Sequence, residues 1–194
     1  MGNNKKRRRK ARWVIIITFW SFILAIIFGF IAQYFLNEIE SLFVSFVILF
    51  LVVILGIIFD LVGTAAAAAK IGPMNSKAAC KVPGAKKGVF LVKNAEQVAN
   101  FCNDVAGDIS GVVSGTLAAL IVFRLVTTIP HDQAEFYIGI LLTALVAAVT
   151  VGGKAWGKIV AISNSTEVIL MVGLLLTKLE RPFKWAKKSE NSTG

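Results

Sequence analysis

The apolar run from Leu42 to Gly63 is the feature that most constrains how this chain folds. Asp60 is its only charged residue. A helix needs about 20 mostly apolar residues to cross a bilayer, and this run meets that length. Over the 194 residues, 56% are hydrophobic and only 16% are charged, a balance far more apolar than that of a soluble domain. We therefore expect an all-α integral membrane protein.

Further apolar runs divide the remainder of the chain. We predict four transmembrane helices, at residues 13–36, 42–63, 109–126 and 136–151. The first run is too long for the core of a signal peptide, so we interpret it as a permanent helix. Residues 166–179 are apolar but short and lead into basic residues, which favours an interfacial helix, with a fifth span as the alternative. One transmembrane domain, 13–182, is expected between a basic tail, 1–12, and a second tail, 183–194.

The distribution of charge predicts the orientation of these helices. The net charge is +10, and the excess lies in residues 5–12, in residues 70–93 and near the C-terminus. Positive residues collect on the cytoplasmic side of membrane proteins, so both termini are expected in the cytoplasm of a multi-pass cell-membrane protein. Arg124 is the exception. Residues 71–97, interrupted by Pro73 and Pro83, are expected to form short cytoplasmic interfacial helices. In so apolar a chain this charge reflects topology, and no nucleic-acid partner is expected.

The usual residues of catalysis are sparse. The single histidine, His131, falls in an expected outside loop, and no motif pairs a nucleophile with a base. Cys80 and Cys102 have no metal-ligand spacing and are expected to be free thiols. We therefore expect neither an enzyme nor a zinc site.

Oxygen ligands, in contrast, gather beside the expected spans. In a regular α-helix, residues 100–115 place Asn103, Gly107, Ser110, Gly111 and Ser114 on one side, flanked by Asp104, Asp108 and Gly115. The spacing also places Gly56, Asp60 and Thr64 on one face of the preceding span. Hard cations such as Mg²⁺ prefer oxygen ligands. The candidate metal-binding residues are Gly56, Asp60, Thr64, Asn103, Asp104 and Asp108.

Two other interpretations of the same residues remain open. Gly107, Gly111 and Gly115 are four residues apart, a spacing typical of close helix packing, in which polar side chains can simply join helices. Asp60 lies near the end of its span and could reach water at the interface. Helix packing without transport is therefore the alternative to cation binding.

The order of these features resembles the transmembrane domain of the CorC/CorB and cyclin M magnesium transporters. The segment Phe59-Asp60-Leu61-Val62-Gly63-Thr64-Ala65 is similar to the family pattern Phe-Ser-x-x-Glu-Thr-Ala, and Asn103 lies in the helix-start segment that follows. Gly152-Gly153-Lys154 resembles the family's Glu-x-Pro-Lys region. The resemblance covers about Leu42 to Pro182. Gly63 stands where the family has Glu, the later proline is absent, and the sequence contains no CBS-domain pair.

The resemblance implies a function and a partner. Family members hold dehydrated Mg²⁺ between serines of one span and an asparagine of the next, within a homodimer. Carried over, the serine positions fall on Gly56 and Asp60 and the asparagine on Asn103. The expected function is binding and transport of Mg²⁺ or a related divalent cation by a homodimer. The alternative is a non-transporting membrane scaffold or subunit that retains the fold.

Overall fold

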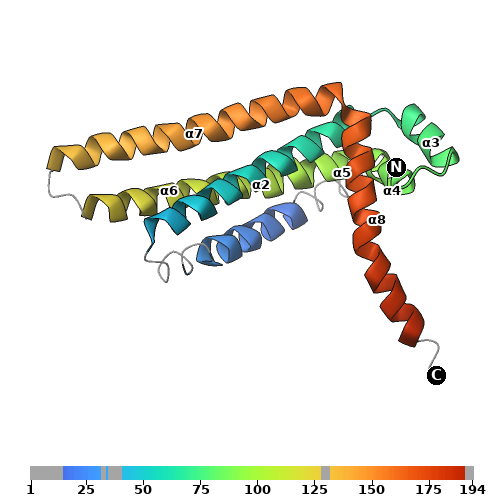
Figure 1. Cartoon of the computed structure of the whole chain (residues 1–194), viewed down its shortest axis with the longest axis horizontal. Coiled ribbons are helices and arrows are strands. Elements are labelled where there is room, and N and C mark those ends of the chain that lie inside the picture. Colours follow the sequence, from blue (N-terminus) through green and yellow to red (C-terminus); the bar gives the residue numbers. More distant parts are fainter. Residues whose placement is uncertain (1–14, 32–33, 35–40, 128–131, 191–194) are drawn as a thin grey trace, which may run out of the picture. The chain divides into compact units, whose positions relative to one another are not determined.

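The computed structural model describes residues 15–31, 34, 41–127 and 132–190. Within these ranges the chain is helical and contains no strand (Figure 1). The basic tail 1–12, residues 37–40 of the first expected loop, His131 and the last four residues of the C-terminal tail lie outside the described residues. The described part confirms the all-α class that the apolar runs predict.

In the described part of the chain, seven α-helices and one π-helix follow a segment of helix at Ile15–Ile31. Their bounds are α2 Leu42–Ala68, α3 Ile71–Ala79, α4 Ala85–Lys93, α5 Ala95–Ala99, the π-helix η1 Asn100–Gly107, α6 Asp108–Thr127, α7 Asp132–Ser163 and α8 Ser165–Glu190.

Among the described residues, three helices are long and apolar enough to cross a membrane. They are Leu42–Ala68, Ala95–Leu125 and Tyr137–Ser163, of 27, 31 and 27 residues. They contain the three predicted spans 42–63, 109–126 and 136–151 almost completely, and each extends beyond the predicted bounds. The helix Ile15–Ile31 is shorter. A fourth span at 13–36 therefore stays a prediction.

The second long helix begins well before the predicted residue 109 because it includes a π-helix. Residues 100–108 are polar, and on composition alone they look like a lead-in to the span. In the structure α5, η1 and α6 follow one another without an interruption. A π-helix replaces i→i+4 hydrogen bonds by i→i+5 bonds, and such segments often occur at functional sites. The regular 100° periodicity used to place Asn103 beside Ser110 therefore does not hold across η1.

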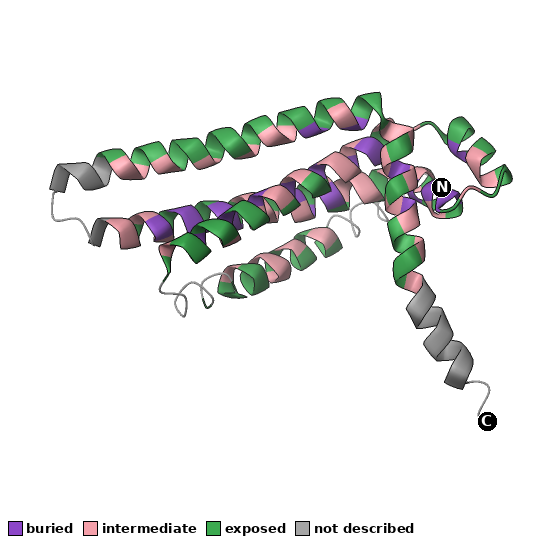
Figure 2. Cartoon of the chain, viewed as in Figure 1, coloured by how far each residue is buried: buried purple, intermediate pink, exposed green. Residues whose placement is uncertain are grey.

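The chain separates into two compact units, and α2 and α7 contribute to both. Unit 1 contains residues 1–57 and 104–153, and unit 2 contains residues 58–103 and 154–194. The core of unit 1 forms where the first part of α2 packs against α6 (Figures 1 and 2). Its buried residues are Leu49, Val53, Val113, Leu117, Ala118 and Ile121. Leu142 and Val146 bring α7 to this core, although most of α7 is exposed (Figure 2). Exposed leucine, isoleucine and phenylalanine side chains are what a lipid-facing helix presents.

Unit 2 is built from the end of α2, the short helices and the second part of α7 with α8. Its buried core consists of Ala65, Ala66, Met74, Ala85, Leu91, Ala161 and Ile169. Helices α3, α4 and α5 confirm that short helices form within residues 71–97, separated by non-helical residues at 80–84 and 94; their position at the membrane interface stays a prediction. Pro83 lies between α3 and α4 as expected, but Pro73 lies in the first turn of α3, where the missing N–H of proline is tolerated.

The backbone at the start of α4 approaches that of α8 closely at two glycines, Gly84 and Gly173. Gly84 precedes α4 with φ of 84°, a left-handed conformation that favours glycine. A side chain at Gly173 of α8 would collide with the carbonyl oxygen of Gly84 and lie 2.9 Å from the nitrogen of Gly88. Lys87 on α4 also forms an ion pair with Glu180 on α8. Helix α8 extends past both ends of the predicted segment 166–179.

Candidate cation site

The carboxylate of Asp60 is buried near the end of the long apolar part of α2. Asp60 is only 4% exposed, and its Oδ2 atom accepts no hydrogen bond. A buried carboxylate without hydrogen-bond donors is energetically costly and normally needs a cationic partner. The local sequence explains the placement, because Asp60 lies on the same face of α2 as Gly56 and Gly63, which are buried as well.

Asn103 supplies a second buried oxygen without a hydrogen-bond partner. Its Oδ1 atom is buried and accepts no hydrogen bond; together with Asp60 Oδ2 it is one of two such side-chain atoms among the described residues. The amide of Asn103 lies directly against the backbone of Gly63. A Cβ atom at Gly63 would collide with Asn103 Oδ1 and would lie 2.8 Å from its Cγ. Only glycine therefore leaves space for Asn103 in this orientation.

Asp60 and the residue that Asn103 contacts, Gly63, lie about one turn apart on α2. Gly63 is three residues beyond Asp60, about 4.5 Å along the axis of α2, and lies on the same side of the helix. Asn103 contacts that turn from η1. Unit 2 therefore contains a carboxylate oxygen and an amide oxygen that are both buried and both without hydrogen-bond donors. Thr64 also belongs to unit 2, one turn beyond Asp60 on α2, and is partly exposed.

Gly56 has a packing role in unit 1. A Cβ atom there would lie 2.9 Å from Cβ of Ser110 and 3.8 Å from the carbonyl oxygen of Gly107. Within this chain, only part of the predicted ridge of small residues meets a neighbouring helix. Gly107 belongs to this contact, whereas a Cβ atom added at Gly111 or Gly115 meets no described atom within 4 Å. Gly111 and Gly115 lie in α6, beyond the end of η1.

The two carboxylates near η1 differ from Asp60 in burial. Asp104 and Asp108 are both exposed, and both belong to unit 1. Two hydroxyls on the side of the helix predicted to carry Asn103 have intrahelical partners. Ser110 donates to the carbonyl of Ala106 at 2.7 Å, and Ser114 donates to that of Gly111 at 3.0 Å. The buried, donor-free oxygens are thus a smaller set than the predicted ligands. Within the described ranges, no three His, Cys, Asp or Glu side chains group as metal ligands.

Sequence reasoning missed the partner of Asp60. The ammonium nitrogen of Lys158, on α7, lies 3.6 Å from Asp60 Oδ2. The sequence indicates only that Lys158 is one of the basic residues after the last long apolar run. No local signal connects it with a residue almost a hundred positions earlier.

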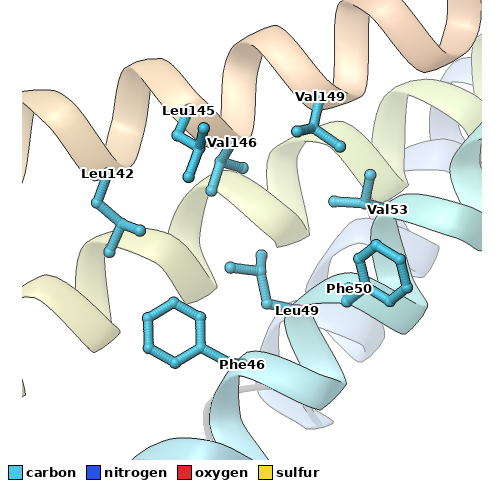
Figure 3. A pocket seen from close by; sticks show the side chains of 8 residues that line it. All are labelled: Phe46, Leu49, Phe50, Val53, Leu142, Leu145, Val146 and Val149. Carbon is cyan, nitrogen blue, oxygen red and sulfur yellow. The ribbon is translucent and has the colours of Figure 1, made fainter.

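A groove in unit 1 differs chemically from this site. Figure 3 shows side chains of α2 and α7 facing each other across it, with a cavity volume of about 150 Å³. Its lining consists of Phe46, Leu49, Phe50, Val53, Leu142, Leu145, Val146 and Val149. All of these side chains are apolar, so the groove offers a cation no ligand.

The chain matches no family model, and it has no significant match among curated proteins or solved structures.

Proposed function

We propose that this protein binds Mg²⁺ or a related divalent cation at Asp60 and Asn103 and carries it across the membrane. The observation that supports the proposal most is the pair of buried oxygens, Asp60 Oδ2 and Asn103 Oδ1, without hydrogen-bond donors. A bound cation would satisfy both, whereas a site of simple helix packing would gain nothing from a buried carboxylate. The resemblance of residues 59–65 and Asn103 to CorB/CorC-type transporters points to the same ion.

The chemistry of Mg²⁺ fits such a small ligand set. This ion keeps several of its waters and binds proteins through one or two carboxylates, with octahedral oxygen distances of about 2.1 Å. One carboxylate, one amide oxygen and water therefore suffice. Thr64, Gly56, Asp104 and Asp108 complete the set of candidate ligands proposed from the sequence. Asp60 and Asn103 are its central members because their oxygens are buried and lack donors.

The proposed membrane arrangement has four spans, with both termini in the cytoplasm and α3, α4 and α8 at the inner interface. Helix Ile15–Ile31 forms most of the first span, and the three long helices form the others. Lysines at positions 70–93 support a cytoplasmic position for the short helices. The working form is a homodimer in the cell membrane, by resemblance to the transporter family.

Thermal unfolding of the full chain in detergent tests the binding part of the proposal. A ligand that binds only the folded state stabilises it by about 2.7 kcal/mol at one hundred times its Kd. At about 2–4 °C per kcal/mol, saturating Mg²⁺ is expected to raise the Tm by roughly 5–10 °C. Asp60→Asn should abolish this rise. Glu167→Gln is the matched control, because it removes an exposed carboxylate of unit 2 that is not among the candidate ligands and should keep most of the rise. Equal Mg²⁺ responses in the two variants would overturn the assignment of Asp60.

Liposomes that contain the protein and a Mg²⁺-sensitive dye test the transport part. Flux that Asp60→Asn removes would support transport. Binding without flux would instead identify a non-transporting membrane subunit that retains the cation site.

A further inference from the structure

The ion pair between Lys158 and Asp60 is unusually open for a buried carboxylate. The Nζ–Oδ2 distance is 3.6 Å, and Oδ2 accepts no hydrogen bond. The two partners also differ in exposure, because the Lys158 side chain is 52% exposed and that of Asp60 only 6%. Lys158 therefore supplies positive charge to Asp60 from the exposed side of the pair, while the lone pairs of Oδ2 accept no hydrogen bond.

A divalent cation at the same carboxylate would conflict with this ammonium group. Mg²⁺ bound about 2.1 Å from Oδ2 would lie within about 6 Å of the ammonium nitrogen in its present position. Like charges at such a distance, beside a buried carboxylate, repel strongly. The ammonium group would also occupy part of the space that the ion's remaining waters require.

The side chain of Lys158 can move away from Asp60. Its charge is carried on a flexible four-carbon stem, and half of its side chain is exposed. The preceding residue, Gly157, is buried, so the backbone of α7 is packed here while the lysine side chain reaches outward. A change of rotamer is sufficient to remove the ammonium group from Asp60.

We propose that Lys158 is a tethered cation that compensates Asp60 in the ion-free protein and is displaced when a divalent cation binds. This inference rests on the proposed function and adds selectivity to it. A monovalent ion that replaced the ammonium group would bring the same charge to Asp60 and would lose some of its water, so its binding would be only weakly favourable. A divalent ion brings twice the charge, so it displaces the lysine more readily. Lys158 thereby raises the concentration at which any cation binds, and it favours divalent over monovalent ions.

Calorimetric titration of Mg²⁺ into the full chain in nanodiscs tests the inference. Lys158→Gln removes the competing charge and is expected to strengthen Mg²⁺ binding at least about threefold. It should also make binding more sensitive to added K⁺, because the internal competitor is gone. Lys158→Arg retains the charge and should stay close to the wild type. Lys93→Gln removes another exposed lysine of unit 2 and is the control for net charge.

A second measurement does not depend on the folding of any variant. Acylation of lysines by a water-soluble ester, followed by mass spectrometry, reports how accessible each amine is in the wild type. Saturating Mg²⁺ should accelerate acylation of Lys158 at least about twofold and leave Lys93 unchanged, if displacement moves the ammonium group into water.

The outcomes separate the two proposals. Wild-type binding that Lys158→Gln leaves unchanged or weakens would overturn the tethered-cation role and leave the cation site intact. An acylation rate of wild-type Lys158 that does not change at saturating Mg²⁺ would have the same consequence. Absence of Mg²⁺ binding in both the wild type and Lys158→Gln would overturn the proposed function, and this inference with it.

Discussion

Gly63→Ala tests the contact that places Asn103 beside α2. The added Cβ would collide with Asn103 Oδ1 and lie 2.8 Å from Cγ of Asn103 and 3.0 Å from Cβ of Cys102. Overpacking of this kind costs about 1–3 kcal/mol, whereas alanine in place of glycine within a helix gains about 1 kcal/mol. The net loss of stability is therefore expected to be about 0–2 kcal/mol.

The matched control isolates the collision from the effect on helix propensity. Gly152 also lies within a long helix, and a Cβ atom there meets no described atom within 4 Å. Gly152→Ala should therefore gain the full propensity term of about 1 kcal/mol. The two variants are expected to differ by about 1–3 kcal/mol, or roughly 2–12 °C in Tm.

Cation binding supplies the second measurement for Gly63→Ala. If Asn103 rotates away to relieve the collision, little stability is lost, but the amide oxygen leaves the site. Mg²⁺ affinity should then fall about tenfold, which corresponds to about 1.4 kcal/mol for one lost ligand. A Gly63→Ala protein with the same Tm as Gly152→Ala and the same Mg²⁺ affinity as the wild type would refute the reasoning.

Three further predictions concern the two cores and the ion-free protein. Ile121→Ala should cost about 1–3 kcal/mol, because within a bilayer the cavity term remains while the transfer term largely vanishes; Phe123→Ala, 65% exposed on the same helix, should change the unfolding free energy by under about 0.5 kcal/mol. Gly173→Val should separate α4 from α8 and lower Tm by several degrees, since its side chain would collide with Gly84, whereas Gly72→Ala meets open space and should not. Without metal, Asp60→Asn should unfold at or above the wild-type temperature, because it removes a buried charge; a fall of several degrees would show that the pair with Lys158 stabilises the fold.

Local patterns predicted the helices better than the contacts between them. Long apolar runs are sufficient to predict spans, because a bilayer leaves the backbone no alternative to internal hydrogen bonding. The short helices at 71–97 followed from apolar residues between prolines. The π-helix at Asn100–Gly107 was not predictable, because it depends on hydrogen-bond partners rather than on composition.

The candidate site was predictable in its residue types and only partly in its geometry. Asp60 attracts attention in any sequence analysis because a carboxylate within an apolar run is costly. Asn103 followed from its place near the next span. Gly63, however, stood out in the sequence only as a departure from the family's Glu, whereas in the structure it is the residue that leaves space for Asn103. Lys158 depends on a tertiary contact between α2 and α7 that no local pattern encodes.

A structure of the protein at saturating Mg²⁺ tests the central claim most directly. The account predicts a metal ion about 2.1 Å from an Asp60 carboxylate oxygen and from Asn103 Oδ1, with water completing an octahedron. It also predicts that Lys158 no longer contacts Asp60. A metal ion bound elsewhere, or Asp60 still paired with Lys158 at saturating Mg²⁺, would contradict it.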